Sequence, residues 1–333
     1  SFAQNTHLSK EFWMISSDLI QFGNTELNVS RFCQGTAFRN MPRESDNTVG
    51  QRVLEHCIDS GINFFDSANG YGFGGSERLL GKAISGKRSK VVVCTKIGAS
   101  HDPDKNGKPG APASFSSDFL YQKASASLGR LGTDYLDLYL LHKEDGITDP
   151  EDIVESMENL GKEGKIRYWG VSNHSADILT KYIDLYNSGD APHFAGVEEY
   201  YNIGGESVLA NGTSRIRMLE KEIFPLIIKT GIGMLAFSPH DMGNLIPGKT
   251  AEEGTPLAML LRSLDKAAHE LRVPRSQVCV AWALSHPEVT YTLGAAESPE
   301  HVEDNIQGSC LNIPQNLLEF LNTASVQYSN EQE

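Results

Sequence analysis

Residues 135–172 read YLDLYLLHKEDGITDPEDIVESMENLGKEGKIRYWGVS, and this stretch decides the fold class. Its two ends, Tyr135–His142 and Tyr168–Ser172, are short, apolar and rich in β-forming residues, which predicts two buried strands. Between them, Pro150–Lys162 has the longer polar and apolar pattern of a helix. A strand, a helix and a second strand in this order predict a parallel sheet.

The same alternation runs along almost the whole chain. We expect strands at Phe32–Thr36, Asn63–Ser67, Val91–Lys96, Tyr135–His142, Tyr168–Ser172, Gly196–Tyr200, Gly233–Phe237 and Val289–Leu293. The helices expected around them are Thr48–Ser60, Ser76–Ile84, Ser116–Leu131, Pro150–Lys162, Ala176–Asn187, Met218–Lys229, Thr255–Leu271 and Ser276–Ser285. Eight such units over about 300 residues match an α/β fold of the (β/α)8 TIM-barrel type.

The barrel is expected to carry additions at both ends. Asp18–Gln21 and Asn28–Phe32 flank the turn pair Gly23-Asn24, a pattern typical of a β-hairpin before the first barrel strand. Extra helices are expected at the C-terminal end. Because no Pro- or Ser-rich linker divides the chain, residues 1–333 are predicted to form a single domain with a core of about residues 22–310.

The composition restricts the class of protein. The 333 residues include 29 Lys and Arg against 43 Asp and Glu, a formal net charge of −14, with 39% hydrophobic residues. This acidic excess disfavours nucleic acid or an acidic membrane surface as a partner. No apolar run approaches the ~18–20 residues of a membrane span. We expect a soluble globular protein.

Cysteine usage bears on metals and on the compartment. The five cysteines form no CxxC pair: Cys33, Cys57, Cys94, Cys279 and Cys310. They are predicted to be buried free thiols, so no metal site is expected. An odd number favours a reducing compartment such as the cytoplasm. Ser1-Phe2-Ala3 has the small-x-small spacing that precedes a signal-peptidase cut, which keeps export as an alternative.

Ionisable residues end three successive predicted strands: Asp66, Lys96 and His142. In a barrel of this type, function lies at the carboxyl ends of the strands, and Tyr71 follows in a glycine-rich loop. Each residue alone has a structural explanation: Asp66 as a cap, Lys96 facing solvent, His142 as a bonded core histidine. Together at one rim, they predict a site.

The stretch 61–72, GINFFDSANGYG, resembles the signature of the aldo-keto reductases. Lys96 after VVVCT and His142 after DLYLL fall where that family keeps its other catalytic residues. The segment 170–173, GVSN, resembles its nicotinamide-binding strand end, and the similarity extends from about residue 22 to residue 305.

The resemblance implies four catalytic roles. Tyr71 is the expected general acid/base, tuned by Lys96 and Asp66, while His142 orients the substrate carbonyl. The lysine ammonium is expected to lower the pKa of Tyr71 from about 10. The implied activity is an NAD(P)-dependent oxidoreductase that interconverts a carbonyl compound and its alcohol.

The resemblance also implies the cofactor contacts, without a GxGxxG loop. Ser172 and Asn173 match carboxamide positions, and Glu198 stands where the family typically has Gln; unless protonated, it cannot donate. Phe237 is expected to stack on the nicotinamide ring, with core packing as the alternative. The remaining expected contacts are Asp66 again and, on the pyrophosphate side, Gly35, Thr36, Ser238, Gly243 and Leu245. Gly74–Glu77 is weak as a phosphate loop and is expected to cap the helix from Ser76.

The last turn bears on the choice of cofactor. NADP-preferring members commonly carry cations there, whereas Ala295, Ala296 and Glu297 offer none. His301, before Asn305, stands where Arg often stands and cannot provide its bidentate fork. This turn favours NAD, although Lys249, Arg215 and Arg217 could still supply a charge.

The substrate is expected to be polar, such as a sugar-derived aldehyde, ketone or lactol, which places the protein in carbohydrate metabolism. The loop Gly98–Ser114, with His101, Asp102 and Lys105, and the loop with His240, Asp241 and Asn244 are both polar. His240 itself is expected to face solvent. The alternatives are a catalytically weak, dinucleotide-binding regulatory subunit or redox sensor, and a sugar epimerase that retains its cofactor. The oligomeric state stays open.

Overall fold

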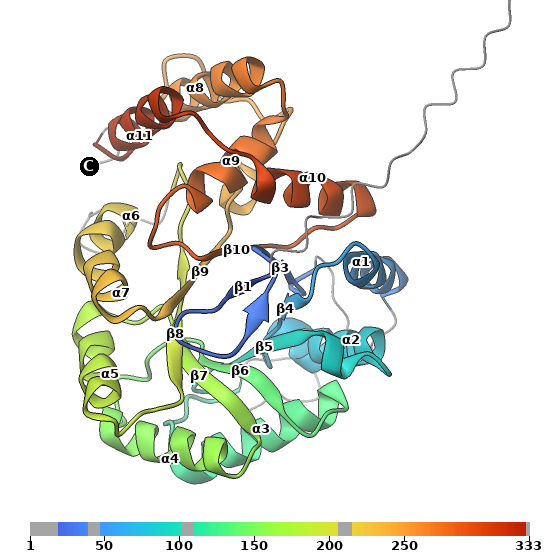
Figure 1. Cartoon of the computed structure of the whole chain (residues 1–333), viewed down its shortest axis with the longest axis vertical. Helices are drawn as coiled ribbons and strands as arrows, with labels where there is room; N and C mark the ends of the chain where they lie inside the picture. Colours follow the sequence, from blue (N-terminus) through green and yellow to red (C-terminus); the bar gives the residue numbers. More distant parts are fainter. Residues whose placement is uncertain (1–18, 39–46, 101–109, 206–214, 331–333) are drawn as a thin grey trace, which may run out of the picture.

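The computed structural model describes residues 19–38, 47–100, 110–205 and 215–330. Within these residues, eight parallel strands close into a barrel in the order β10-β3-β4-β5-β6-β7-β8-β9 (Figure 1). They are β3 (Phe32–Gly35), β4 (Phe64–Asp66), β5 (Val92–Ile97), β6 (Leu136–Leu141), β7 (Ile166–Ser172), β8 (Phe194–Tyr200), β9 (Gly233–Phe237) and β10 (Tyr291–Gly294). The (β/α)8 barrel expected from the sequence is confirmed.

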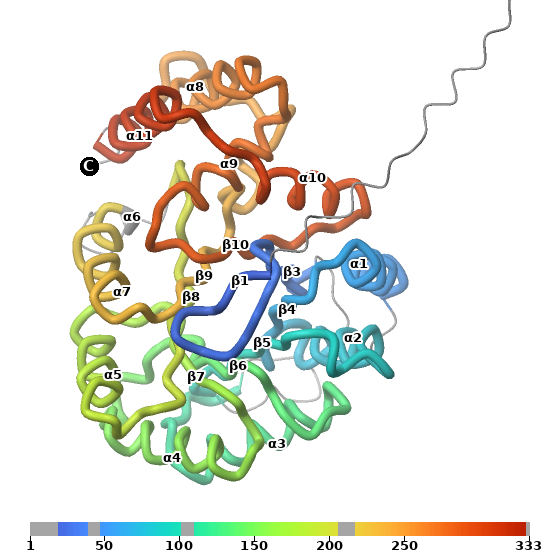
Figure 2. Tube along the Cα trace, in the orientation of Figure 1, coloured from blue at the N-terminus to red at the C-terminus, as the bar shows by residue number. Residues whose placement is uncertain are grey.

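Helices surround the barrel, and the chain returns to its start. They are α1 (Thr48–Asp59), α2 (Gly75–Ile84), α3 (Ser117–Leu131), α4 (Pro150–Lys162), α5 (Ala176–Ser188), α6 (Arg215–Met218), α7 (Phe224–Thr230), α8 (Pro256–Leu271), α9 (Arg275–Leu284), α10 (Pro299–Cys310) and α11 (Gln315–Asn330). The trace in Figure 2 shows α10 returning beside α1, while the last helix, α11, packs on α8. The C-terminal helices therefore close the ring and extend it.

Local side-chain bonds decide where several helices begin and end. The side chain of Asn47 accepts a bond from the Gly50 amide at the start of α1, and Thr255 does the same for α8. At the other end, α3 and α5 stop at glycines with positive φ, Gly132 and Gly189. Such glycines adopt the left-handed conformation without steric cost, which ends the helix there.

The expected boundaries differ from the structure at a few elements. β7 begins at Ile166, which pairs with Leu136, two residues before the expected start. β10 begins at Tyr291, because Val289 still belongs to a turn in which its amide bonds to His286. The single helix expected at residues 218–229 is interrupted by a π-helical segment at residues 219–223. Pro225 follows that segment and has no N–H to continue the regular bonding.

The expected N-terminal hairpin is present, with shorter strands than expected, and its apolar residues pack into the barrel interior. β1 (Ile20–Gln21) pairs antiparallel with β2 (Asn28–Val29). Phe22, between them, stacks on Tyr291 with ring centroids 5.2 Å apart, inside the barrel. Gly23 has φ 52°, and a Cβ built there would lie 2.3 Å from the Gly233 backbone nitrogen. Glycine is therefore required at this turn.

The strands separate two apolar layers. One lies between strands and helices, and the other fills the barrel interior with residues such as Phe64, Cys94 and Leu138. Because side chains alternate along a strand, Lys96 faces the interior two residues beyond Cys94. Four of the cysteines are buried free thiols as expected, whereas Cys310 is exposed at the end of α10. The interior stays apolar until its carboxyl end, where charged residues replace the aliphatic ones.

Candidate active site

Three strand ends bring three ionisable side chains together in the barrel interior. Asp66 ends β4, Lys96 lies near the end of β5, and Glu198 lies near the end of β8. The Lys96 Nζ donates to Asp66 Oδ1 at 2.5 Å and lies 3.1 Å from Glu198 Oε1. All three are buried, with exposed fractions of 0%, 1% and 2% for Lys96, Asp66 and Glu198. They form one ion cluster away from solvent.

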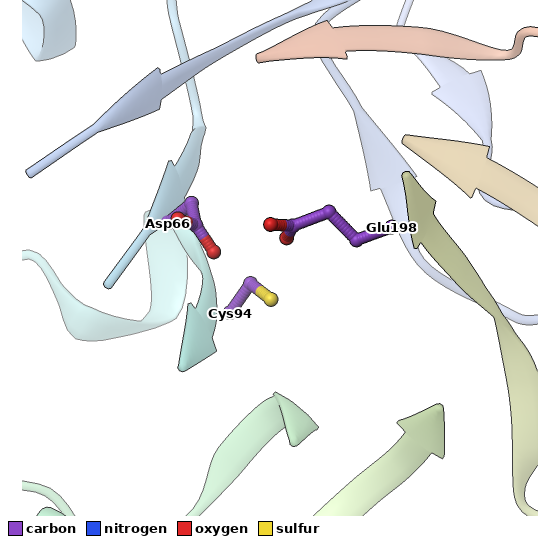
Figure 3. Close-up of side chains that lie close together, drawn as sticks. All are labelled: Asp66, Cys94 and Glu198. Carbon is purple, nitrogen blue, oxygen red and sulfur yellow. The ribbon is translucent and has the colours of Figure 1, made fainter. Parts of the chain in front are cut away.

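Figure 3 shows the carboxyl groups of Asp66 and Glu198 pointing toward each other, with the Cys94 thiol beside them. Their ligand atoms lie within 4.8 Å of one another, a spacing that could suit a metal ion. The Lys96 ammonium, however, bonds to both carboxyl groups and already supplies a cation between them. We therefore describe the group as an ion cluster built around a lysine.

The cluster changes the pKa of its members. Burial lowers the pKa of Lys96, but the carboxyl groups of Asp66 and then Glu198 outweigh this effect and hold the pKa well above its ordinary value. Burial, and then the Asp66 carboxylate, raise the pKa of Glu198 to about 8, against the opposing effect of Lys96. At neutral pH the lysine is charged and Glu198 carries a proton.

Tyr71 lies beside this cluster, at the start of a short 3₁₀ helix after β4. The Lys96 Nζ is 5.4 Å from the centroid of its half-buried ring. Burial raises the pKa of Tyr71, Lys96 lowers it, and Asp66 and Glu198 raise it again, so that it ends above its ordinary value. Lys96 thus acts on the pKa of Tyr71 in the expected direction, but burial and then the carboxyl groups of Asp66 and Glu198 outweigh it, so the expected net lowering does not occur.

His142 follows β6 and meets Tyr71 edge-on, with ring centroids 5.8 Å apart at 80°. Its backbone amide donates to the Ile97 carbonyl at 2.8 Å, which holds the residue at the strand end. Burial, and then the Lys96 charge, lower the pKa of His142 to about 4. At neutral pH the ring is uncharged and has one N–H to donate.

The residues expected at a nicotinamide carboxamide lie on adjacent strands. Ser172 at the end of β7 pairs with Glu198 of β8. The side-chain amide of Asn173 donates to the Ser172 hydroxyl at 2.9 Å and to the His142 carbonyl at 3.1 Å. Phe237 ends β9, is half-buried, and lies 5.4 Å from the Tyr200 ring. A hydroxyl, an amide, a carboxyl group and a partly exposed aromatic face fit a carboxamide on a flat ring.

The residues expected on the pyrophosphate side are already bonded within the protein. The Thr36 hydroxyl donates to Ser67, and the Ser76 hydroxyl donates to the Thr36 carbonyl. Ser76 therefore ties α2 to the end of β3 and does not cap the helix, which begins at Gly75. Gly35 lies against Leu293, which leaves little room for a side chain.

The loop after β9 is folded on itself. Ser238 has φ 62°, and the amides of Gly243 and Leu245 both bond to the His240 carbonyl, at 2.9 and 3.2 Å. His240 is not the solvent-facing residue expected, because it is largely enclosed and its Nε2 bonds to the Ser276 carbonyl at 3.1 Å. Asp241 is also buried, and it accepts the hydroxyl of Tyr200.

The turn before α10 is short of cations, as expected from its sequence. Ala295 and His301 are exposed, Glu297 is half-buried, and Ala296 and Asn305 are buried. Of the possible cations from elsewhere, Lys249 is exposed, whereas Arg217 bonds to Glu220 and to Ser325, each at 2.7 Å. The Arg215 side chain and the residues His101, Asp102 and Lys105 lie outside the described part of the chain.

The contact between Glu198 and Lys96 was not predicted from the sequence. The sequence suggested Glu198 as a cofactor contact, whereas the structure shows it bonded to Lys96. These two residues are 102 positions apart, so no local pattern joins them. The sequence feature that pointed to this contact is the alternation of side-chain direction along the strand at residues 198–200, which places Glu198 in the barrel interior.

Known proteins resemble this chain along most of its length. The family model described as "Aldo/keto reductase family" matches residues 31–319. An uncharacterized oxidoreductase YrpG of Bacillus subtilis is 30% identical over 322 residues, which cover 90% of this chain and 93% of the relative. The NADH-specific methylglyoxal reductase of Escherichia coli is 27% identical, over 88% of this chain and 94% of that protein.

Two further matches complete the comparison. A probable voltage-gated potassium channel subunit beta of Arabidopsis thaliana is 28% identical, covering 86% of this chain and 89% of its own. The solved holo structure of the aldo-keto reductase AKR11C1 from Bacillus halodurans superimposes with a TM-score of 0.76 at 26% identity, over 92% of this chain and 96% of that chain. With the matched family model and the barrel, these findings show that the chain belongs to the aldo/keto reductase family, whose members are oxidoreductases that use nicotinamide cofactors.

Proposed function

We propose that this chain is an NAD(P)-dependent oxidoreductase that interconverts an aldehyde, ketone or lactol and the corresponding alcohol, with Tyr71 as the general acid/base. The observation that carries the proposal is the buried Lys96, bonded to Asp66 and Glu198 and 5.4 Å from the Tyr71 ring. A buried ion cluster beside a tyrosine at the carboxyl rim of a barrel is costly for folding and suited to proton transfer.

In this mechanism Tyr71 donates its phenol proton to the substrate carbonyl oxygen. Lys96 stabilises the phenolate that remains, and Asp66 holds the ammonium in place. The neutral His142 donates a hydrogen bond to the same oxygen and so aligns the carbonyl. A bound reduced nicotinamide ring supplies the hydride, since no side chain can. In the opposite direction, the Tyr71 phenolate accepts the alcohol proton.

For the cofactor, we propose that Ser172, Asn173 and Glu198 hold the carboxamide and that Phe237 stacks on the ring. The pyrophosphate and adenosine contacts are proposed at Gly35, Thr36, Ser238, Gly243, Leu245, Ala295, Glu297, His301 and Asn305. For Gly243 and Leu245 this requires the loop to rearrange, because their amides are bonded to His240 in the structure. Asp66 is proposed to act on the cofactor indirectly, through its bond to Lys96.

We propose NAD as the preferred cofactor. The turn before α10 has Glu297 and an exposed His301 where a 2′-phosphate would favour a cation, and Arg217 is bonded elsewhere. The name of the Escherichia coli relative specifies NADH. Titration of the protein with NAD and NADP, followed by tryptophan fluorescence, tests this preference, and tighter binding of NADP would contradict it.

For the substrate, we propose a sugar or a related polar carbonyl compound. The support is the polar sequence of the loop at residues 98–114, of which residues 101–109 lie outside the described part. His240 and Asp241 do not support this choice of substrate, because both side chains bond within the protein. Turnover of steroids without activity on any sugar or polyol would overturn this choice.

A carbonyl panel with NADH tests the activity itself. We expect NADH consumption that depends on an added aldehyde or ketone and that the Tyr71→Phe variant loses. Binding of the cofactor with no consumption, unaltered in that variant, would instead support a dinucleotide-binding regulatory subunit. The channel-subunit relative favours this second candidate.

Two wider proposals concern the whole chain. We propose a single domain, because the described part of the chain shares one barrel with strands from residues 32 to 294. We also propose the cytoplasm as its compartment, on the buried free thiols. No helix in the described part combines the length and the apolarity that a bilayer crossing needs.

A further inference from the structure

The buried cluster contains two carboxyl groups for one ammonium. Asp66 and Glu198 lie 2.5 and 3.1 Å from the Lys96 Nζ, and none of the three is more than 2% exposed. With both carboxyl groups ionised, the cluster would carry an uncompensated negative charge. Burying such a charge is unfavourable, so the cluster is stabilised by keeping one proton.

That proton belongs on Glu198. Asp66 makes the shorter bond to Lys96, and burial followed by the Asp66 carboxylate raise the pKa of Glu198 to about 8. The ionisable groups around this region are Asp66 of β4, Lys96 and Cys94 of β5, Cys33 of β3, Tyr71, and His142 after β6. Burial, and then Lys96, lower the pKa of His142 to about 4, so its ring is uncharged at neutral pH. Burial raises the pKa of both thiols and of the phenol, so these groups are neutral. Among the described residues named here, Lys96 is the one that carries a positive charge.

A nicotinamide ring changes its charge during the reaction. The oxidised ring is a cation and the reduced ring is neutral. Glu198 pairs with Ser172 across β7 and β8, and Tyr200 pairs with Phe237 across β8 and β9. The proposed function, on which this inference rests, places the ring among these residues. An oxidised ring there would supply the positive charge that the cluster lacks.

We propose that Glu198 links the redox state of the cofactor to a proton: it releases its carboxyl proton to solvent when the oxidised cofactor binds and keeps it when the reduced cofactor binds. In its protonated form Glu198 has the donor and the acceptor of a glutamine, and in its ionised form it is a pure acceptor. The side chain therefore contacts the carboxamide in both states, while the summed charge of ring and cluster stays constant.

The test is calorimetry of NAD and NADH binding to the wild-type chain at pH 7, in two buffers of different ionisation enthalpy. We expect release of close to one proton (~0.9) with NAD and none with NADH, because a group of pKa about 8 is mostly protonated at this pH. Equal proton release with the two forms would overturn the inference. Failure of both forms to bind would instead refute the proposed function, and with it the inference.

Two variants assign the proton. In Glu198→Gln we expect the proton release with NAD to disappear while NADH still binds. Glu199→Gln is the matched control, since Glu199 is the next residue of β8, is also buried, and points to the opposite side of the strand. This control should release the proton as the wild type does. Release that persists in Glu198→Gln contradicts the assignment.

A measurement on the wild type alone keeps the inference testable if that variant does not fold. The ratio of NAD to NADH affinity should rise with pH by up to tenfold per unit, and level off above pH 8. A ratio that is constant between pH 6 and 9 would refute the link.

Discussion

Single residues hold Tyr71 in its protonated form. Burial raises the pKa of its phenol, and the two carboxyl groups around Lys96 reduce the effect of the ammonium. The raised pKa keeps the phenol protonated at neutral pH, but it also makes the phenol a weaker acid. The proposed proton transfer to a carbonyl therefore depends on Lys96, whose charge stabilises the phenolate that forms.

Removing this proton donor gives the first prediction. Tyr71→Phe should lower kcat for carbonyl reduction by about 10²–10⁴-fold, the usual contribution of general acid catalysis, with an unchanged Kd for NADH. Steady-state kinetics and fluorescence titration measure the two quantities. Tyr168→Phe is the matched control, because its hydroxyl accepts a bond from the Glu26 amide beside the hairpin. That control should retain turnover within about twofold.

The neutral His142 leads to a prediction on pH. Because burial and then Lys96 lower its pKa from 6.5 to about 4, the ring does not change charge between pH 5.5 and 7.5. We expect kcat/KM for reduction to show no inflection near pH 6.5 that depends on this residue. An inflection in the wild type that is absent from His142→Asn would show that the ring titrates in this range.

At the scale of single residues, part of the site could be predicted from the sequence and part could not. The strand-end rule selects Asp66, Lys96 and His142 with Tyr71, and the structure places these side chains around one rim. The same rule cannot show that Glu198 bonds to Lys96, since the closure of the barrel decides this contact. It also cannot show that Asp241 is buried under Tyr200, because loop conformation depends on tertiary packing.

At the scale of elements, the N-terminal hairpin is fixed by a glycine. Gly23→Ala would place a Cβ 2.3 Å from the Gly233 nitrogen at a φ of 52°. We expect a loss of about 3 kcal/mol in the free energy of unfolding, from backbone strain and overpacking together. Urea denaturation followed by circular dichroism measures it.

The control for this prediction is Gly86→Ala. Gly86 also has a positive φ, of 73°, but a Cβ there meets no atom within 4 Å. The control should lose about 1 kcal/mol, from strain alone. Equal losses in the two variants would mean that the close approach to Gly233 does not matter.

The turn before α10 gives an element-scale prediction on the cofactor. His301 is exposed in the first turn of this helix, where the side chain of Ser298 accepts the His301 amide. His301→Arg should tighten NADP binding by about fivefold, mainly at low salt, and leave NAD binding unchanged. His269→Arg, at the exposed C-terminal end of α8, is the matched control and should change neither.

Elements were predictable where the pattern was local. The strand β9 and the helix α4 have the expected bounds, because the apolar run of β9 ends before Ser238 and α4 begins with a proline in its first turn. The interruption at residues 219–223 was not predicted, although Pro225 lies in the interior of the helix expected at residues 218–229, where its missing N–H prevents regular bonding. The contact between α10 and α1 follows from closure of the barrel, which no single segment encodes.

At the scale of the whole molecule, buried ionisable groups oppose one another in stability. Burial lowers the pKa of His142, His174, His240 and His286. The unfolded chain therefore binds more protons at these sites, and stability is lost as pH falls below about 6.5. Glu198 acts in the other direction: its folded pKa of about 8 exceeds the ordinary value of 4.5, so its contribution is lost as pH rises between them.

This opposition gives a prediction for the whole fold. Compared with the wild type, Glu198→Gln should gain about 1 kcal/mol in free energy of unfolding for each pH unit from 5 to 8. Urea denaturation at pH 5, 6, 7 and 8 measures the difference. Glu199→Gln serves again as the control and should not show that slope. A constant difference between Glu198→Gln and the wild type would mean that Glu198 is ionised in the folded protein.

The lysine at the centre of the cluster has a consequence for how the site is maintained. Its positive charge is part of the covalent chain and bonds to both carboxyl groups. Unlike a bound ion, it cannot be diluted away, removed by a chelator or exchanged for a competing element. The charges of Lys96 and Asp66 are thus fixed by the amino-acid sequence. The proton of Glu198 is the exchangeable component of the cluster.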